Sequence, residues 1–193
     1  MGLREKLNVR QNIWRLRPEV LCGPTIPMPM SGVAPRVVLG QAWWDAEREA
    51  AKQSTNWHCV ACGVFHREAR LYPRLEGHEL YTIDYEFGLM MYMETVPLCH
   101  YCHSFIHCGR LNMMLNQRKI TPHLYNSIMK HGKGVLSDAG LTKPKDYNGP
   151  VAEWGDWRLV IVGDKPSDIP KEYPPLYKSL EEWHKAFDVT TEE

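Results

Sequence analysis

The sequence predicts an α+β protein that is built around a clamped pair of strands. Two Cys-x-x-Cys pairs are separated by 36 residues. The stretch between them is rich in aromatic and β-branched residues, whereas the stretches before and after it carry helix-forming patterns. These observations predict strands in the middle, helices on both flanks, and a strand and a helix appended at the C-terminal end.

The first part of the chain, residues 1–40, is predicted to be an extended arm. Residues 1–17 carry five basic side chains, which suit either a solvated arm or one that contacts phosphates. Residues 18–39 hold five prolines and two glycines, a density that disfavours helices. We therefore expect residues 18–39 to lie extended over the body.

A central block, residues 41–135, is predicted to begin with a helix over 41–54, where helix-forming residues predominate. The inner face of that helix is expected to carry small and aromatic side chains. They are Ala42, Ala46, Ala50 and Trp43 or Trp44. The helix delivers the chain to the first cysteine pair.

Two strands are predicted to follow, over residues 71–83 and 89–96. Residues 84–88 supply the turn between them, and Pro97 is expected to close the second strand. Such a hairpin would lie between the two cysteine pairs.

Two helices are predicted after the second cysteine pair, over residues 101–117 and 121–130. Thr121 and Pro122 suit the start of the second helix. The glycines at 132 and 134 are expected to interrupt it, with a short helix beyond them.

The last segment, residues 136–193, is predicted to contain a strand over 157–163 and a helix over 179–187. Charge changes near this boundary: residues 1–150 hold 18 Lys and Arg against 13 Asp and Glu, and the remainder holds 5 against 10. A segment this short rarely builds its own core, so we expect it to pack on the body.

The paired cysteines predict a structural zinc site. Zinc in such sites prefers four thiolates in a tetrahedron, and the two pairs supply them. The four ligands would be Cys59, Cys62, Cys99 and Cys102. One pair precedes the predicted strands and the other follows them, so the ion would clamp the hairpin. The remaining cysteines, Cys22 and Cys108, are expected to be inert thiols.

Three histidines in the same block predict a second metal site. His103 and His107 are one helical turn apart, so both rings can face one point, which His78 would approach from the strands. Three imidazoles leave coordination positions open, as in catalytic rather than structural sites. Ordinary structural histidines are the alternative. The other six histidines are expected to be ordinary, with His100 pointing outward.

This block resembles the HNH nuclease family, whose core is the ββα-metal fold. The resemblance rests on three motifs that cover about a quarter of the chain. They are Cys59-x2-Cys62, Leu75-Glu-Gly-His-Glu79 and Val96-Pro-Leu-Cys99-x2-Cys102-His103-x3-His107. A looser match, carried by residues 32–36 and 43–45, is similar to phage-encoded HNH-type proteins.

The resemblance implies a catalytic metal held by His78, His103 and His107. Glu79 then takes the place of the general base, where the family usually has histidine; a one-residue shift would instead make His78 the base. Glu79 is alternatively a fourth metal ligand. Glu94 stands where the family carries an asparagine that holds the base, which fits a changed base or a lost activity.

The implied function is hydrolysis of phosphodiester bonds in DNA. A divalent ion on the histidines (Mg²⁺, Mn²⁺, Ni²⁺ or Zn²⁺) would bind a phosphate oxygen and the leaving 3′ oxygen, while Glu79 activates a water. Arg110, Arg118 and Lys119 are candidates for contacts to the nucleic-acid backbone, or form a solvated helix face. The arm at 1–17 is the best candidate for setting specificity.

Other functions compete with this one. A catalytically inactive HNH-like zinc-binding module could bind nucleic acid or a protein of the host or phage, and a double-metal scaffold is a third interpretation. A zinc deaminase is excluded because His78-Glu79 lacks the residue that separates its histidine and glutamate. No apolar run approaches the ~20 residues that span a bilayer, so we expect no membrane partner and a cytoplasmic protein, in the host cytoplasm if phage-encoded.

Overall fold

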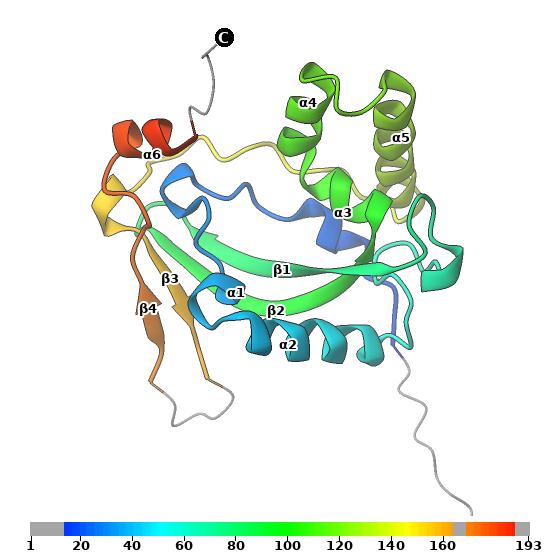
Figure 1. The fold of residues 1–193 in the computed structure, drawn as a ribbon, viewed down its shortest axis with the longest axis horizontal. Coiled ribbons are helices and arrows are strands. Elements are labelled where there is room, and N and C mark those ends of the chain that lie inside the picture. Colours follow the sequence, from blue (N-terminus) through cyan, green and yellow to red (C-terminus); the bar gives the residue numbers. More distant parts are fainter. Residues whose placement is uncertain (1–13, 164–168, 188–193) are drawn as a thin grey trace, which may run out of the picture.

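The computed structural model describes residues 14–163 and 169–187, which form a four-stranded sheet with helices packed on it (Figure 1). The strands, in sheet order, are β1 (Leu75–Asp84), β2 (Leu89–Cys99), β3 (Arg158–Ile161) and β4 (Lys171–Tyr173). β1 and β2 are antiparallel, β3 runs parallel to β2, and β4 is antiparallel to β3. The predicted α+β fold class is confirmed.

The two long strands differ from the prediction at one end each. β1 begins at Leu75 rather than at residue 71, because Leu71 has a left-handed backbone (φ +69°) that a strand cannot contain. β2 runs through Pro97 to Cys99 instead of ending at the proline. Only residues 89–91 pair with β3, so among the described residues no strand lies on that side of Pro97, and its missing N–H is tolerated.

The segment at 18–39 contains three short helical turns, so the expectation of an extended chain is wrong. They are η1 (Pro18–Cys22), η2 (Met28–Met30) and α1 (Pro35–Val38). Each turn has a proline at its first or second position, where the missing N–H needs no partner and the fixed φ suits a helix. The prolines therefore start turns here rather than prevent them.

Helix α2 (Gln41–Ser54) covers the predicted residues. Of its predicted inner face, the tryptophans are confirmed and the alanines are wrong. The three alanines at 42, 46 and 50 are exposed. The ring of Trp44 packs on β1 at Gly77, where an added Cβ would lie 2.9 Å from the ring. Trp43 meets Tyr92 of β2 edge to face, with ring centroids 5.8 Å apart. The tryptophans, not the alanines, join this helix to the sheet.

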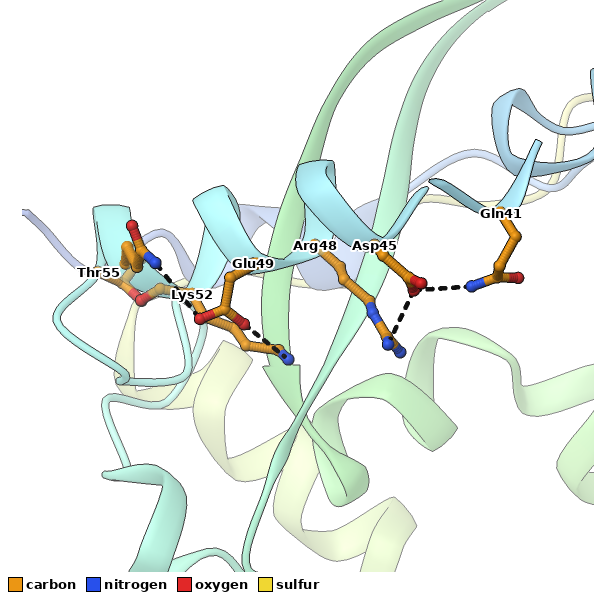
Figure 2. A network of polar contacts seen from close by, with 7 residues as sticks. Gln41, Asp45, Arg48, Glu49, Lys52 and Thr55 are labelled. Carbon is orange, nitrogen blue, oxygen red and sulfur yellow. Dashed lines mark hydrogen bonds and ion pairs between the residues drawn. The ribbon is translucent and has the colours of Figure 1, made fainter. Parts of the chain in front are cut away.

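The outer face of α2 carries polar pairs at helical spacing, which Figure 2 shows. Three contacts form it: Gln41 Nε2 donates to Asp45 Oδ1 (2.7 Å), Arg48 pairs with Asp45 (2.8 Å), and Lys52 pairs with Glu49 (3.6 Å). Pairs three or four residues apart on an exposed face each stabilise a helix by about 0.2–0.5 kcal/mol. They support α2 without reaching the sheet.

The helices after β2 also depart from the prediction. Instead of one helix over 101–117, α3 (His100–Ile106) and α4 (Cys108–Asn116) are separated at His107, whose φ and ψ are −85° and 44°. Helix α5 (Pro122–Asp138) runs through both glycines without interruption. At Gly132 an added Cβ would lie 2.1 Å from the ring of Phe105, so glycine allows α3 to approach α5. Thr121 caps α5 as predicted, accepting from Leu124 N (3.1 Å).

The C-terminal part adds β3, β4, the turn η4 (Trp154–Asp156) and α6 (Leu180–Phe187). The predicted strand over 157–163 is shorter, and β4 was not predicted because Lys-Glu-Tyr has no apolar alternation. Trp157 and Leu159 are fully buried with Met30 and Met90 in a second core. The division of the chain at residues 40 and 135 stays a prediction. Within the described ranges, every helix is too short or too polar to cross a bilayer.

Candidate functional site

Four cysteine thiols meet where β2 passes into α3. Cys59 and Cys62 lie in a tight loop that ends at Gly63. Gly63 has a φ of +75°, and its N–H donates to the Cys59 carbonyl (2.8 Å). Cys99 ends β2, and Cys102 lies in the first turn of α3. The four Sγ atoms lie within 4.8 Å of one another, and all four residues are free thiols.

This donor set fits a structural zinc ion. Tetrahedral thiolates at a Zn–S distance of about 2.3 Å lie about 3.8 Å apart, and the Sγ atoms of Cys62 and Cys99 are 3.7 Å apart. Hydrogen bonds from the other thiols, that from Cys102 first, hold the pKa of Cys59 far below its usual range. The same kind of bond, that to Cys59 first, raises the pKa of Cys102. The four side chains together can hold a metal ion such as zinc, which binds cysteine as the thiolate.

His131, on α5, extends the cysteine group. Its Nε2 lies 3.4 Å from Cys102 Sγ, and its ring meets Tyr101 edge to face at 5.6 Å. A histidine N–H that donates to a ligand sulfur orients the ligand and stabilises its thiolate. The sequence suggested no such role, because His131 is 29 residues beyond Cys102.

His78, His103 and His107 form a second group. One ring nitrogen of each lies within 4.8 Å of the other two, and the ring centroids are 4.8 to 5.3 Å apart. His78 lies on β1 and His103 lies in the last turn of α3. His107 is the residue that directly follows α3. The three predicted ligands are therefore brought together.

Burial keeps two of these imidazoles neutral. It lowers the pKa of His78 to about 2 and that of His107 to about 4, with the neighbouring histidines adding to the effect. His78 Nδ1 is buried without a hydrogen-bond partner among the described residues. Such an orphaned nitrogen costs free energy unless a ligand meets it, and neutral imidazole is the form that binds metals.

Glu76 positions the helix histidines. Its Oε2 lies 2.5 Å from His103 Nδ1 and its Oε1 lies 3.0 Å from His100 Nδ1; these bonds, that of His100 first, lower the pKa of Glu76 well below its usual range. Donation from Nδ1 leaves the Nε2 of His103 free for a ligand. The expectation that His100 points outward is wrong. The role of Glu76 could have been predicted from its position two residues before His78, because residues two apart lie on the same face of a strand.

Glu79 faces away from the three histidines. Neighbouring strand residues point to opposite faces, so Glu79 lies on the side of α1 and α2, where it forms an ion pair with Arg36. Its side chain is only 7% exposed. The three-histidine group found in the described chain does not include it. Its predicted roles, as base or as fourth ligand, stay predictions. Glu94 also forms an ion pair, with Arg17, at an N–O distance of 2.7 Å.

A cleft of about 940 Å³ opens over the three histidines. Three cationic side chains from distant segments line it: Arg36, Arg110 and Lys143. Of the two acidic residues in its lining, Glu79 is paired with Arg36 and Asp146 accepts from Thr25 Oγ1 (2.9 Å). Three positive and two negative side chains thus leave the lining of the cleft with a net charge of +1 beside the neutral imidazoles.

The predicted backbone contacts divide into two groups. Arg110 lies in the first turn of α4 and lines the cleft. Arg118 and Lys119 are exposed beyond the end of α4 and are not among the cleft's lining residues. Arg36 and Lys143 were missed, because nothing in their local sequence marks them. Of the arm at 1–17, residues 1–13 lie outside the described residues.

No protein-family model, curated protein or solved structure matches this chain. The fold and its two ligand groups define the class: an α+β protein with a four-cysteine site and a three-histidine site beside a cationic cleft. Function is therefore inferred from the chemistry of these residues.

Proposed function

We propose that this chain is a metal-dependent HNH-type nuclease that hydrolyses phosphodiester bonds in DNA, similar to phage-encoded proteins of that family. The observation that carries the proposal is the three-histidine group beneath a cleft with three cationic side chains. In this proposal β1, β2 and α3 form the ββα-metal core, and the four cysteines hold its zinc clamp. Neutral imidazole ligands leave the full charge of a divalent ion for an anionic substrate.

His78, His103 and His107 are the proposed ligands of that second ion, with Mg²⁺, Mn²⁺, Ni²⁺ and Zn²⁺ as candidates. When bound, the ion supplies Lewis-acid stabilisation of the phosphate and of the leaving 3′ oxygen. Glu76 holds the His103 ring through Nδ1. Arg110 and Lys143 line the cleft, and in this proposal they bind neighbouring phosphates.

Arg36 links substrate binding to the proposed base. Among the described strands β1 lies at the edge of the sheet, and the cleft is lined from both of its faces, by His78 on one and Glu79 on the other. An incoming phosphate competes with the Glu79 carboxylate for the Arg36 guanidinium. A carboxylate released from that ion pair is able to take a proton from water. The base is then available only when substrate is bound.

A catalytically inactive HNH-like zinc-binding module, with a nucleic acid or a host or phage protein as its partner, is the second candidate. The ion pair of Glu79 with Arg36 favours it, because it engages the carboxylate assigned to the base. The pairing of Glu94 with Arg17 points the same way, since Glu94 stands at the asparagine position of the family. This candidate keeps the zinc site and lacks cleavage.

A cleavage assay separates the two candidates. Protein holding one equivalent of zinc is mixed with supercoiled plasmid, single-stranded DNA or RNA, and each divalent metal is added in turn. We expect metal-dependent nicking that His103→Ala abolishes. His123→Ala is the matched control, because His123 is exposed on α5. Cleavage of no substrate with any metal would establish the inactive module.

Two further variants test the base. Glu79→Gln is expected to lower kcat by about 10²-fold or more, as expected for removal of a general base. Arg36→Gln leaves the carboxylate unpaired and is expected chiefly to weaken DNA binding, since its guanidinium contacts phosphate. Full activity of Glu79→Gln would remove Glu79 from the mechanism while leaving the nuclease assignment intact.

A further inference from the structure

The segment from the turn η3 (His66–Glu68) to the start of β1 carries a basic loop, defined here as residues 67–74. Two large apolar side chains in it reach solvent: Leu71 is 52% exposed and Tyr72 is 43% exposed. Three exposed arginines surround them, at positions 67, 70 and 74. Glu68 is the acidic residue of the loop, which leaves a net charge of +2. Apolar and cationic groups are thus presented together.

The arginines of the basic loop are not neutralised within the described part of the chain. The ion pairs formed by described residues involve none of them. Arg74 lies over the ring of Tyr72 instead, 5.1 Å from its centroid. Unpaired arginines on one loop attract a polyanion, and arginine also binds phosphate through paired N–H groups.

Leu71 is held in an unfavourable backbone conformation. Its φ is +69°, in the left-handed region that leucine rarely adopts. The side chain that this conformation supports is half exposed, so packing in the core does not explain it. Local strain that presents an exposed apolar side chain is typical of binding surfaces.

The basic loop lies beside the three-histidine group. The ring of Tyr72 meets His100 edge to face at 4.8 Å, and His100 shares Glu76 with His103. In Figure 1 the loop lies at the end of the sheet where β1 begins and α3 starts. Successive nucleotides of one strand are about 3.4 Å apart along a duplex, so a strand that passes from the histidines toward the start of β1 brings its next nucleotides to the loop.

We propose that the basic loop is a duplex-DNA contact surface, in which Arg67, Arg70 and Arg74 bind backbone phosphates and Leu71 enters a groove against the base edges. Apolar side chains inserted between base steps, flanked by phosphate contacts, hold and deform a duplex in this way. The inference rests on the proposed nuclease function for the position of the substrate, and it names double-stranded DNA as that substrate.

The test uses the full chain with His103→Ala, so that DNA is bound without cleavage. Affinity for a labelled duplex and for one of its strands is measured by fluorescence anisotropy between about 50 and 200 mM salt. Arg67→Gln, Arg70→Gln and Arg74→Gln are combined. The control combines Lys171→Gln, Lys178→Gln and Lys185→Gln, which removes three exposed charges elsewhere on the surface.

The loop variant is expected to weaken duplex binding at least tenfold. It is also expected to lower the slope of log K against log salt by about 0.9 for each phosphate that an arginine no longer neutralises. The control is expected to keep the wild-type slope. Equal slopes for wild type and loop variant would overturn the proposal, as would absence of duplex binding by the His103→Ala protein.

Leu71→Ala and Leu71→Gly separate binding from folding. Both remove the side chain, but only glycine relieves the left-handed backbone, so Leu71→Gly is expected to raise Tm by about 2–4 °C. Both are expected to weaken duplex binding by about threefold or more and single-strand binding much less. Wild-type duplex affinity in both variants would overturn the role of Leu71.

Failure of this proposal and failure of the proposed nuclease are distinguishable. A protein that nicks plasmid but binds duplex equally well with and without the loop arginines is a nuclease whose basic loop does not bind DNA. A protein that cleaves nothing, yet binds duplex through the loop, has the DNA-binding surface without the reaction.

Discussion

At the scale of the residue, the carboxylate of Glu76 decides which nitrogen of His103 is available. The carboxylate accepts a hydrogen bond from Nδ1 of both His100 and His103, and its own pKa falls because both bonds favour the charged form. The orphaned Nδ1 of His78 has no such partner among the described residues. In the three-histidine group, His103 on the helix is therefore held by Glu76, whereas His78 on the strand keeps a ring nitrogen without a hydrogen bond to any described residue.

Glu76→Gln should weaken metal binding at the proposed three-histidine site about 10- to 100-fold, because an amide orients His103 less well and removes a negative charge. The measurement is calorimetric titration of Ni²⁺ or Mn²⁺ into protein already holding one equivalent of zinc. Glu94→Gln is the matched control, since Glu94 lies in the same hairpin but pairs with Arg17. Equal affinity in the two variants would rule out the orienting role.

At the scale of the element, the approach of α3 to α5 sets the position of both ligand groups. Cys102 and His103 lie on α3, and Phe105 of the same helix packs against α5 at Gly132. His131, beside that glycine, reaches Cys102 from α5. The spacing of these two helices thus controls where Cys102 and His103 lie.

Gly132→Ala should destabilise the protein by about 1–3 kcal/mol, because the new methyl group overlaps the Phe105 ring and forces the helices apart. Gly134→Ala on the same helix meets nothing within 4 Å, and should stabilise it by about 0.5–1 kcal/mol through helix propensity. Urea unfolding at fixed zinc measures both changes. A Gly132→Ala protein as stable as Gly134→Ala would contradict this account of the helix packing.

At the scale of the whole molecule, the four cysteines join the chain before the hairpin to the chain after it. All four belong to or pack against the larger core, together with residues from η1, α3 and α5. The second core, around Trp157, lies at the β3 side of the sheet and contains no cysteine among its described members. Removing an ion from the four-cysteine site is therefore expected to act first on the half that holds the histidines.

Zinc removal should unfold that half of the molecule. Structural zinc contributes roughly 10 kcal/mol or more of apparent binding free energy, comparable with the whole stability of a domain. Cys59→Ser, or a chelator, is expected to abolish hydrogen-exchange protection in α3 and α5, whereas Cys22→Ser keeps it, because Cys22 is outside the four-cysteine group. Persistence of α3 protection after stoichiometric zinc release would contradict the structural role.

Local spacing was enough to predict the cysteine group, the limits of α2, the turn of the hairpin and the meeting of three histidines. Each depends on residues a few positions apart, or on a hairpin that brings two such groups together. The same reasoning failed for the glycines at 132 and 134, because a glycine that weakens an isolated helix is required where another helix packs closely against it.

Contacts across long separations came from the tertiary structure alone. Arg36 and Glu79 are 43 residues apart, and Lys143 reaches the cleft from beyond α5. The packing of the whole chain sets the backbone path that brings such side chains together. The spacing of residues along the sequence does not predict that path. The ligands could thus be predicted from their pattern, whereas the charges that surround them, and the state of the proposed base, were decided by the fold.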